Sequence, residues 1–367
     1  MASRILFHYM NCEKKLLFST AFSKAYYFKP ICVCCASNTS SSRRSIYKTE
    51  EVKKFRFFVL QHYLDYLKSY NAILEKKFPG AMRVYRVFMD GMKEFFNDLK
   101  LYIKLVHNLN IAGKSLETFN VREVELYEQM PKDMRRIAPL LILSILPLTH
   151  YVLFPIAYYF PRHLLCRHFW NLQQKSEFSI ILLRKRLVHN KPVFRHLQLQ
   201  LPKLKENALH KKWSVVLGLV GSGLQPQPEQ IVACKDLFVN GPYHLMYLSG
   251  NHVKHLLKMH ELHMGWFRRT RLGDRAVILQ AMDRAILREG GVEILSTDNL
   301  RHACLIRGLN PMNMKNEDMV NWLKGWIAVS SEIDKDSLSL LLHCPILLAY
   351  NEPTNWQLIY DTKQPKL

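Results

Sequence analysis

The chain has 367 residues, a formal net charge of +22, and a hydrophobic fraction of 49%. That length allows one or two domains with a sizeable core, and the excess of cations favours a polyanionic neighbour: nucleic acid, anionic lipid or an acidic protein. The eight cysteines do not form a disulfide framework or the two spaced C-x-x-C pairs of a structural zinc site, and they indicate a reducing compartment.

Residues 1–49 form a basic leader that contains eight Lys/Arg and a single acid, Glu13. An arginine-bearing, serine-rich and acid-poor leader is typical of a mitochondrial transit peptide, whereas a secretory signal needs a longer uncharged core. The leader is therefore predicted to direct mitochondrial import. An ordinary disordered basic tail is the alternative.

Residues 50–136 have the spacing of apolar side chains expected of helices, with no strand alternation. The pattern predicts helices over about 51–78, 83–107 and 120–136. In the third helix, acidic residues lie in the first turns, where the helix dipole favours them. We expect this region to be a packed helical part of the protein without chemistry of its own.

Residues 137–160 are a run of 24 residues without a charge. As a helix the run would extend about 36 Å, which exceeds the roughly 30 Å of a bilayer's hydrocarbon core. Three prolines interrupt it, which transmembrane helices tolerate when neighbouring groups satisfy the freed carbonyls. We predict one transmembrane helix, with two short buried helices broken by proline as the alternative.

The flanks of this run predict its orientation. Residues 161–186 carry six cations and one acid, whereas residues 117–136 carry four cations and five acids. The more positive side stays inside the membrane-bounded compartment. For an inner-membrane protein of the mitochondrion, the C-terminal part should therefore lie in the matrix.

After residue 160 the chain has the pattern of an all-α domain. Proline, glycine and serine signals divide it into successive helices. The first expected helix begins at Pro226 and Pro228 and ends at Asn240, and the next two cover about 252–263 and about 274–289. A fourth starts at a Ser296/Thr297 cap and stops at Gly308, and the last two lie around 319–327 and about 336–350. Residues 351–367 are expected to be a flexible tail.

Three ordered stretches, "LSTDNLRHACLIRGL" (295–309), "MVNWLKGWI" (319–327) and "SLSLLL" (337–342), resemble the C-terminal signature of the LETM domain family. The proline-rich run followed by "FPRHLLCRHFW" resembles the start of that domain, so the likeness covers roughly 137–350. It is closest to the short LETM domain-containing proteins. The resemblance implies a single-pass mitochondrial inner-membrane protein whose 14-3-3-like matrix domain, residues 161–350, binds ribosomes or assembly factors and supports mitochondrial organisation and respiration.

Long LETM proteins are also tied to cation/proton exchange and volume homeostasis. Two departures in this chain weaken the expectation that it shares that activity. Where those proteins carry a membrane acid three residues after a proline, this chain has His150, which is neutral at matrix pH and does not attract a metal cation by charge. No EF-hand loop occurs. A single span would also need a homo-oligomer to enclose a pathway, so exchange or its regulation is kept as the alternative function.

The basic block at residues 161–212 is the main candidate site, since it carries twelve cations and two acids. Part of this charge serves positive-inside retention, and the remainder is predicted to bind ribosomal RNA or protein, or an anionic lipid such as cardiolipin. The residues predicted for this contact are Arg162, Arg167, His168, Trp170, Arg184, Lys185, Arg186, Arg195, Lys203, Lys205, Lys211 and Lys212.

No catalytic motif, phosphate loop or cofactor signature is present, so we expect a protein that is not an enzyme and that uses no cofactor. Four histidines, His252, His255, His260 and His263, are spaced so that they share one face of a helix. That face permits metal binding, but one straight helix does not supply tetrahedral ligands. A solvated or partner-facing surface is preferred, and no metal site is expected.

Overall fold

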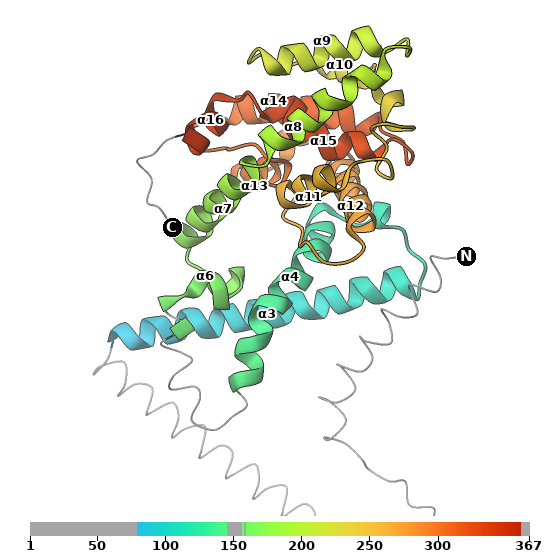
Figure 1. The fold of residues 1–367 in the computed structure, drawn as a ribbon. Coiled ribbons are helices and arrows are strands. Elements are labelled where there is room, and N and C mark those ends of the chain that lie inside the picture. Colours follow the sequence, from blue (N-terminus) through green and yellow to red (C-terminus); the bar gives the residue numbers. More distant parts are fainter. Residues whose placement is uncertain (1–78, 145–155, 158, 361–367) are drawn as a thin grey trace, which may run out of the picture. The chain divides into compact units, whose positions relative to one another are not determined.

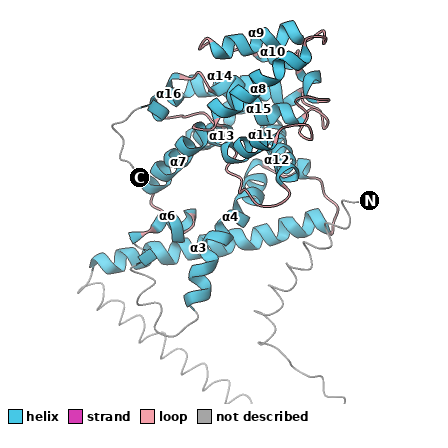
Figure 2. Ribbon diagram, viewed as in Figure 1, coloured by secondary structure: helices cyan, strands magenta, loops and turns pink. Residues whose placement is uncertain are grey.

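The computed structural model describes residues 79–144, 156–157 and 159–360. The chain divides into two units, Met1–Pro79 and Gly80–Leu367, and all described residues except Pro79 belong to the second. All regular elements among the described residues are helices (Figures 1 and 2). The predicted all-α class is confirmed there, while the likeness to 14-3-3 proteins stays a prediction.

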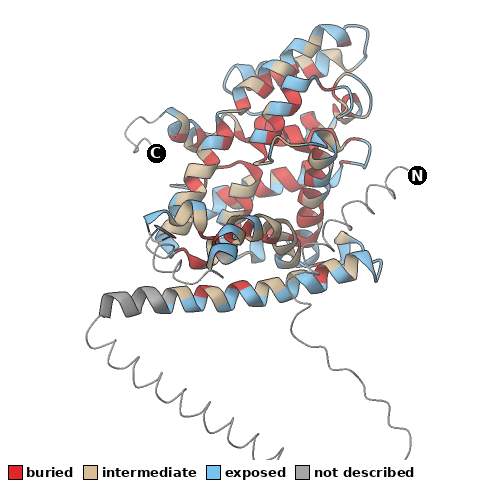
Figure 3. Ribbon diagram, turned by 60° about the horizontal axis from the view of Figure 1, so that its bottom comes forward, coloured by how far each residue is buried: buried red, intermediate tan, exposed pale blue. Residues whose placement is uncertain are grey.

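Two long helices begin the described part. They are α3 (Pro79–Asn110) and α4 (Val121–Ser144), joined through the short 3-10 helix η1 (Leu116–Thr118). Both were expected from the apolar spacing, whereas the helix predicted at 51–78 lies outside the described residues. Large apolar side chains of α3 such as Phe95 and Leu105 are buried, but Phe96 is about half exposed. Figure 3 shows the resulting alternation of buried and exposed positions along α3.

Helix α4 does not stop at residue 136, where the membrane run was expected to begin. It continues through Pro139 to Ser144, and Ile137 and Leu140 pack with Phe95 and Trp170 in a buried apolar cluster. The remaining central part of the predicted span, including His150, lies outside the described residues. None of the helices that the structure describes is long and apolar enough to cross a membrane.

The next helices connect this region to the main core. They are α6 (Pro161–Leu164), η2 (Arg167–Phe169), α7 (Leu172–Leu187), α8 (Asn190–Gln200), η3 (Leu201–Leu204), α9 (His210–Gly221), α10 (Pro228–Val232) and η4 (Lys235–Phe238). The helix predicted to end at Asn240 starts at Pro228, but it ends at Val232 and η4 follows as a separate 3-10 turn. The prediction missed this break.

The remaining elements are α11 (Gly250–Met259), α12 (Arg268–Arg288), η5 (Val292–Ile294), α13 (Thr297–Arg307), α14 (Asn316–Ser331), α15 (Leu338–Ala349) and α16 (Pro353–Tyr360). Helix α12 contacts α4, α11, α14 and α15. Helix α15 is buried from Ser339 to Ala349, in agreement with its almost wholly apolar sequence. These contacts make α12 and α15 the centre of the largest apolar cluster.

Helix α13 is confirmed at both ends. The Ser296 hydroxyl accepts a hydrogen bond from the Asn299 amide over 3.3 Å, and the chain turns left-handed at Gly308, where φ is 93°. A serine cap and a glycine stop are both local signals. A Cβ at Gly308 would also lie 3.2 Å from the Pro345 Cβ, so the position favours glycine for two reasons.

The flexible tail predicted from residue 351 is wrong over 353–360, where α16 packs on the domain. Asn355 is buried, accepts a hydrogen bond from the Asn310 amide at 2.8 Å, and donates to the carbonyls of Gly308 and Ala349. Leu358 joins an apolar cluster with residues of α7. The prediction failed because α16 is held by distant partners and not by a strong pattern of its own.

Candidate nucleic-acid interface

The twelve residues predicted to bind a polyanion do not form one surface, because they differ in burial. Lys185, Arg195, Lys203, Lys205, Lys211 and Lys212 are exposed; Arg162, Arg167, His168 and Arg184 are half-buried; Trp170 and Arg186 are buried. The cations nearest to the predicted membrane run are therefore the least accessible ones. The exposed ones occur mainly later in the segment.

Four of the exposed residues form what we call the lysine face: Lys203, Lys205, Lys211 and Lys212. They lie on η3, at its C-terminal cap and on the first turn of α9, and η3 and α9 contact each other. None of the four forms an ion pair with a described residue. Their ammonium groups are therefore available to a partner.

Two aromatic members of the predicted site act within the fold. The His168 Nε2 lies 3.0 Å from an Asp98 oxygen on α3, and the Trp170 indole donates to the Pro161 carbonyl over 3.1 Å. The Arg136 guanidinium lies 5.5 Å from the centre of the Trp170 ring, within cation–π distance. These contacts dock η2 against α3 and α4, and the ligand contact of His168 and Trp170 stays a prediction.

Arg186 differs most from the predicted exposed binding surface, because its side chain is buried inside the domain. Its guanidinium donates to three carbonyls: Met259 over 2.8 Å, Leu305 over 2.9 Å and Ile306 over 2.8 Å. These acceptors lie in the last turns of α11 and α13, where helix carbonyls lack the usual intrahelical donors, although the Leu305 carbonyl also accepts from the Gly308 amide at 3.2 Å. Arg186 therefore ties α7 to two other helices.

Replacing Arg186 by alanine should lower the free energy of unfolding by about 3 kcal/mol, since three carbonyls would lose a charged donor. The neighbouring substitution Lys185→Ala removes the same charge from an exposed position and should change it by less than about 0.5 kcal/mol. Denaturant unfolding of the purified chain, followed by far-ultraviolet circular dichroism, measures both. Equal effects of the two substitutions would contradict the assignment of Arg186.

The four histidines expected on one helical face are separated in the structure. Helix α11 ends at Met259, so His260 and His263 leave its surface, and His252 and His260 are buried. The His252 Nε2 lies 2.9 Å from the His343 Nε2, and the His260 Nε2 lies 2.9 Å from the Leu342 carbonyl oxygen. The predicted partner-facing surface is wrong. Within the described part of the chain, no group of three or more potential ligands is placed to hold a metal ion.

Sequence reasoning did not find the buried charged network around Asp283 of α12. The Arg307 guanidinium donates to one Asp283 oxygen from Nε at 3.0 Å and from Nη2 at 2.5 Å, and the Trp326 indole donates to the other at 3.1 Å. Both charged side chains are almost fully buried. A single acid inside the apolar stretch "VILQAMDRAIL" is the sequence signal that could have revealed it.

Residues 119–347, which include this network and the whole basic block, match the family described as "LETM1-like, RBD". The chain belongs to the LETM1-like family. The resemblance read from the three C-terminal stretches is thereby confirmed. The matched range begins at residue 119, two residues before α4 and well before the predicted membrane run.

Two LETM1 domain-containing proteins illustrate the relationship. "LETM1 domain-containing protein 1" of Xenopus tropicalis is 34% identical over 287 residues, which cover 77% of this chain and 82% of the relative. The protein of the same name from Homo sapiens is 27% identical over 314 residues, covering 85% and 87% of the two chains. Neither the family description nor these names state an enzymatic activity.

Proposed function

We propose that this LETM1-like protein is a non-enzymatic tether of the mitochondrial inner membrane, whose matrix domain binds ribosomes or assembly factors and supports mitochondrial structure and respiratory function. Family membership supports the proposal, as do the acid-poor leader and the charge asymmetry around the apolar run. Cation exchange receives no comparable support, because the expected membrane acid is replaced by His150.

The lysine face is the observation that carries the proposal. It offers four exposed ammonium groups on two adjacent elements, with none used in an ion pair inside the described domain. Phosphate backbones bind such groups through release of condensed counterions, which makes the affinity depend strongly on salt. Ribosomal RNA is a partner with this chemistry, and the buried cations of the block are not needed for it.

Co-sedimentation of the detergent-solubilised full-length protein with purified mitoribosomes, over a series of salt concentrations, tests this proposal. Replacing Lys203, Lys205, Lys211 and Lys212 by glutamine should weaken binding and flatten the salt dependence, because each lost phosphate contact reduces the slope of log K against log salt by about 1. A matched control removes four exposed lysines elsewhere, on α3 and α11: Lys100, Lys104, Lys254 and Lys258.

The control variant on α3 and α11 should keep the parent's slope of log K against log salt if the lysine face makes the contact. Absence of co-sedimentation at every salt concentration, or equal losses in the two quadruple variants, would reject the proposed interface. Carbonate extraction and protease protection on isolated mitochondria test the membrane part separately. We expect the protein to remain with the membrane pellet, and its C-terminal domain to resist protease until the inner membrane is opened.

A further inference from the structure

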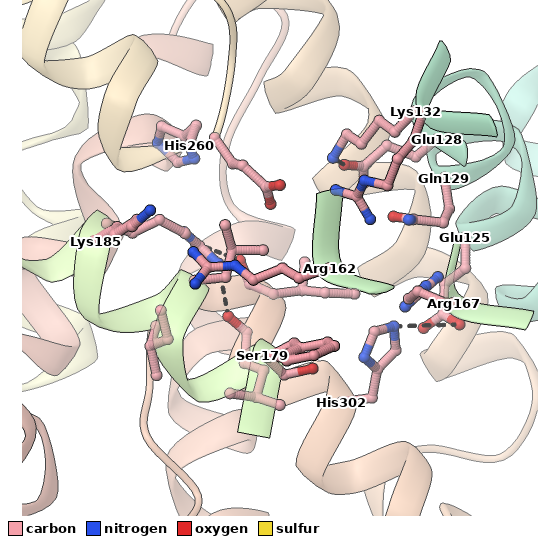
Figure 4. A pocket seen from close by; sticks show the side chains of 18 of the residues that line it. Glu125, Glu128, Gln129, Lys132, Arg162, Arg167, Ser179, Lys185, His260 and His302 are labelled. Atoms are coloured by element: carbon pink, nitrogen blue, oxygen red, sulfur yellow. Dashed lines mark hydrogen bonds and ion pairs between the residues drawn. The ribbon is translucent and has the colours of Figure 1, made fainter. Parts of the chain in front are cut away.

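A cavity of about 370 Å³ lies among α4, α6, α7, α12 and α13 (Figure 4). Its lining is rich in charge, with more basic than acidic side chains. The basic ones are Lys132, Arg136, Arg162, Arg167, Lys185, Arg186 and Arg275, and the acidic ones are Glu125, Glu128 and Glu261. The cations therefore exceed the carboxylates by four.

The most buried carboxylate of the cavity is already neutralised by its own partners. Glu128 forms ion pairs with Lys132, at 2.7 Å, and with Arg275. Burial alone would raise the pKa of Glu128, but the two cations outweigh it and bring the pKa to about 2. Glu128, Lys132 and Arg275 together therefore carry a net positive charge. The Glu128 carboxylate is already paired and is not free for the remaining arginines.

Five cations of the lining have no ion pair within the described residues. Arg136 lies over the Trp170 ring and Arg186 donates to carbonyls, whereas Arg162, Arg167 and Lys185 have neither kind of contact. Figure 4 shows Arg162, Arg167 and Lys185 among the side chains around the cavity. Burial raises the pKa of Glu125, and the nearby charge of Arg167 opposes this shift. The unpaired guanidinium groups point to a ligand with negative charge.

Arg186 adds a buried cation, and the nearby carboxylates of Glu261 and Glu128 compensate its charge only in part. Its donors are satisfied by carbonyls, which are neutral, and its pKa is lowered to about 10 by burial and then by repulsion from Arg275. Glu128 is shared between Arg275 and Lys132, so the two guanidinium groups that repel each other are incompletely compensated, which is costly inside a protein. A ligand anion in the cavity would supply this compensation.

Two buried polar atoms of lining residues also lack a hydrogen-bond partner: Nε of Arg275, a donor, and Nδ1 of His260. Because the His260 Nε2 lies 2.9 Å from the Leu342 carbonyl oxygen, it carries the proton and Nδ1 is left as an acceptor. Burial lowers the pKa of His260 to about 3, so the ring is neutral. A phosphate monoester, whose second pKa is about 6, presents both acceptor oxygens and a hydroxyl donor near neutral pH.

We propose that this cavity is a binding site for a phosphate-bearing ligand, either a soluble phosphate ester or the headgroup of an anionic phospholipid. Arg162 and Arg167 bind the phosphate oxygens, and buried Arg275 and Arg186 provide the positive potential. The proposal goes beyond ribosome binding and uses different residues, because no residue of the lysine face lines the cavity.

Pyrophosphate and vesicles serve as the probes. Binding of pyrophosphate to the detergent-solubilised full-length protein is measured by calorimetry, and binding of the protein to phosphatidylcholine vesicles is measured with and without cardiolipin. Arg162→Gln combined with Arg167→Gln should weaken the saturable interaction at least about tenfold, as expected when charged hydrogen bonds are lost. Lys100→Gln combined with Lys104→Gln removes equal charge from exposed positions of α3, outside both the cavity and the lysine face, and should leave the interaction unchanged.

The two arms identify the source of the phosphate. Saturable pyrophosphate binding that cardiolipin vesicles do not displace indicates a soluble ester, whereas binding to cardiolipin vesicles alone, lost in the arginine variant, indicates a headgroup. Both support the site. The proposal is overturned if neither probe binds saturably to the parent, or if the arginine and lysine double variants bind equally well.

Arginine modification provides a test that needs no variant. Phenylglyoxal labelling of the parent protein, read residue by residue by mass spectrometry, should show Arg162 and Arg167 protected by the bound probe. Exposed Arg195 on α8 should be modified equally with and without it. Unprotected cavity arginines would count against the site even if ribosome binding through the lysine face succeeds, so the two proposals can fail separately.

Discussion

Replacing Asp283 by alanine is expected to destabilise the domain by about 3–5 kcal/mol, the cost of leaving a buried charge without its partner. Arg307 would keep its hydrogen bond to the Ala303 carbonyl, at 2.8 Å, but it would lose both donations to Asp283, and the Trp326 indole would lose its acceptor. These residues connect α12, α13 and α14 in the interior. The loss therefore acts on three helices at once.

Denaturant unfolding of the purified full-length chain measures this loss. The double variant Asp283→Ala with Arg307→Met should recover much of the stability, because it removes the stranded cation together with its partner. Glu293→Ala breaks the exposed pair with Lys324, at 2.6 Å, and should have no measurable effect. If the Asp283 variant were as stable as the Glu293 variant, the network would not hold these helices together.

The parts of the fold that sequence predicted are those set by neighbouring residues. The Ser296 cap and the Gly308 stop of α13 depend on side-chain and backbone chemistry within a few positions, so both ends were found. The apolar spacing of α3 and α14 also lies within each segment. The resemblance to the LETM family rests on stretches of this kind, whose residue order is distinctive, and the family match confirms it.

The errors arose where the role of a residue is set by distant chain. In the run Arg184-Lys185-Arg186, nothing local shows that only Arg186 points inward, since its acceptors on α11 and α13 lie far along the sequence. The sequence likewise predicts a surface position for His252, because its partner His343 is 91 residues away and no local pattern indicates the contact. Buried polar groups need partners, but composition and spacing do not say which ones.

Acidification should destabilise the domain well before its carboxylates titrate, because three buried histidines are neutral in the folded state. Burial, with smaller contributions from neighbouring positive groups, lowers the pKa of His252 to about 2 and of His260 to about 3, and burial lowers that of His343 to about 4. In the unfolded chain each titrates near 6.5. The folded state therefore binds fewer protons below pH 6.5, and stability is lost as pH falls.

The stability is fully present above about pH 6.5 and declines through the interval towards the folded pKa values. Each histidine contributes about 1.4 kcal/mol per pH unit in that interval, so three contribute roughly 4 kcal/mol per pH unit. Denaturation midpoints and slopes at pH 7.5, 6.5 and 5.5 measure the trend. Glu125, whose pKa is raised by burial, acts in the opposite direction at lower pH.

His260→Gln isolates one proton from this dependence, because glutamine can still donate to the Leu342 carbonyl while it does not titrate. The free energy of unfolding of this variant should fall less steeply with decreasing pH than that of the parent, by about 1.4 kcal/mol per pH unit. His107→Gln makes the same change at an exposed position of α3 and should keep the parent slope. A parent protein equally stable at pH 7.5 and 5.5 would show that the three imidazoles accept protons without unfolding, and that water or a counter-ion reaches them in the folded state.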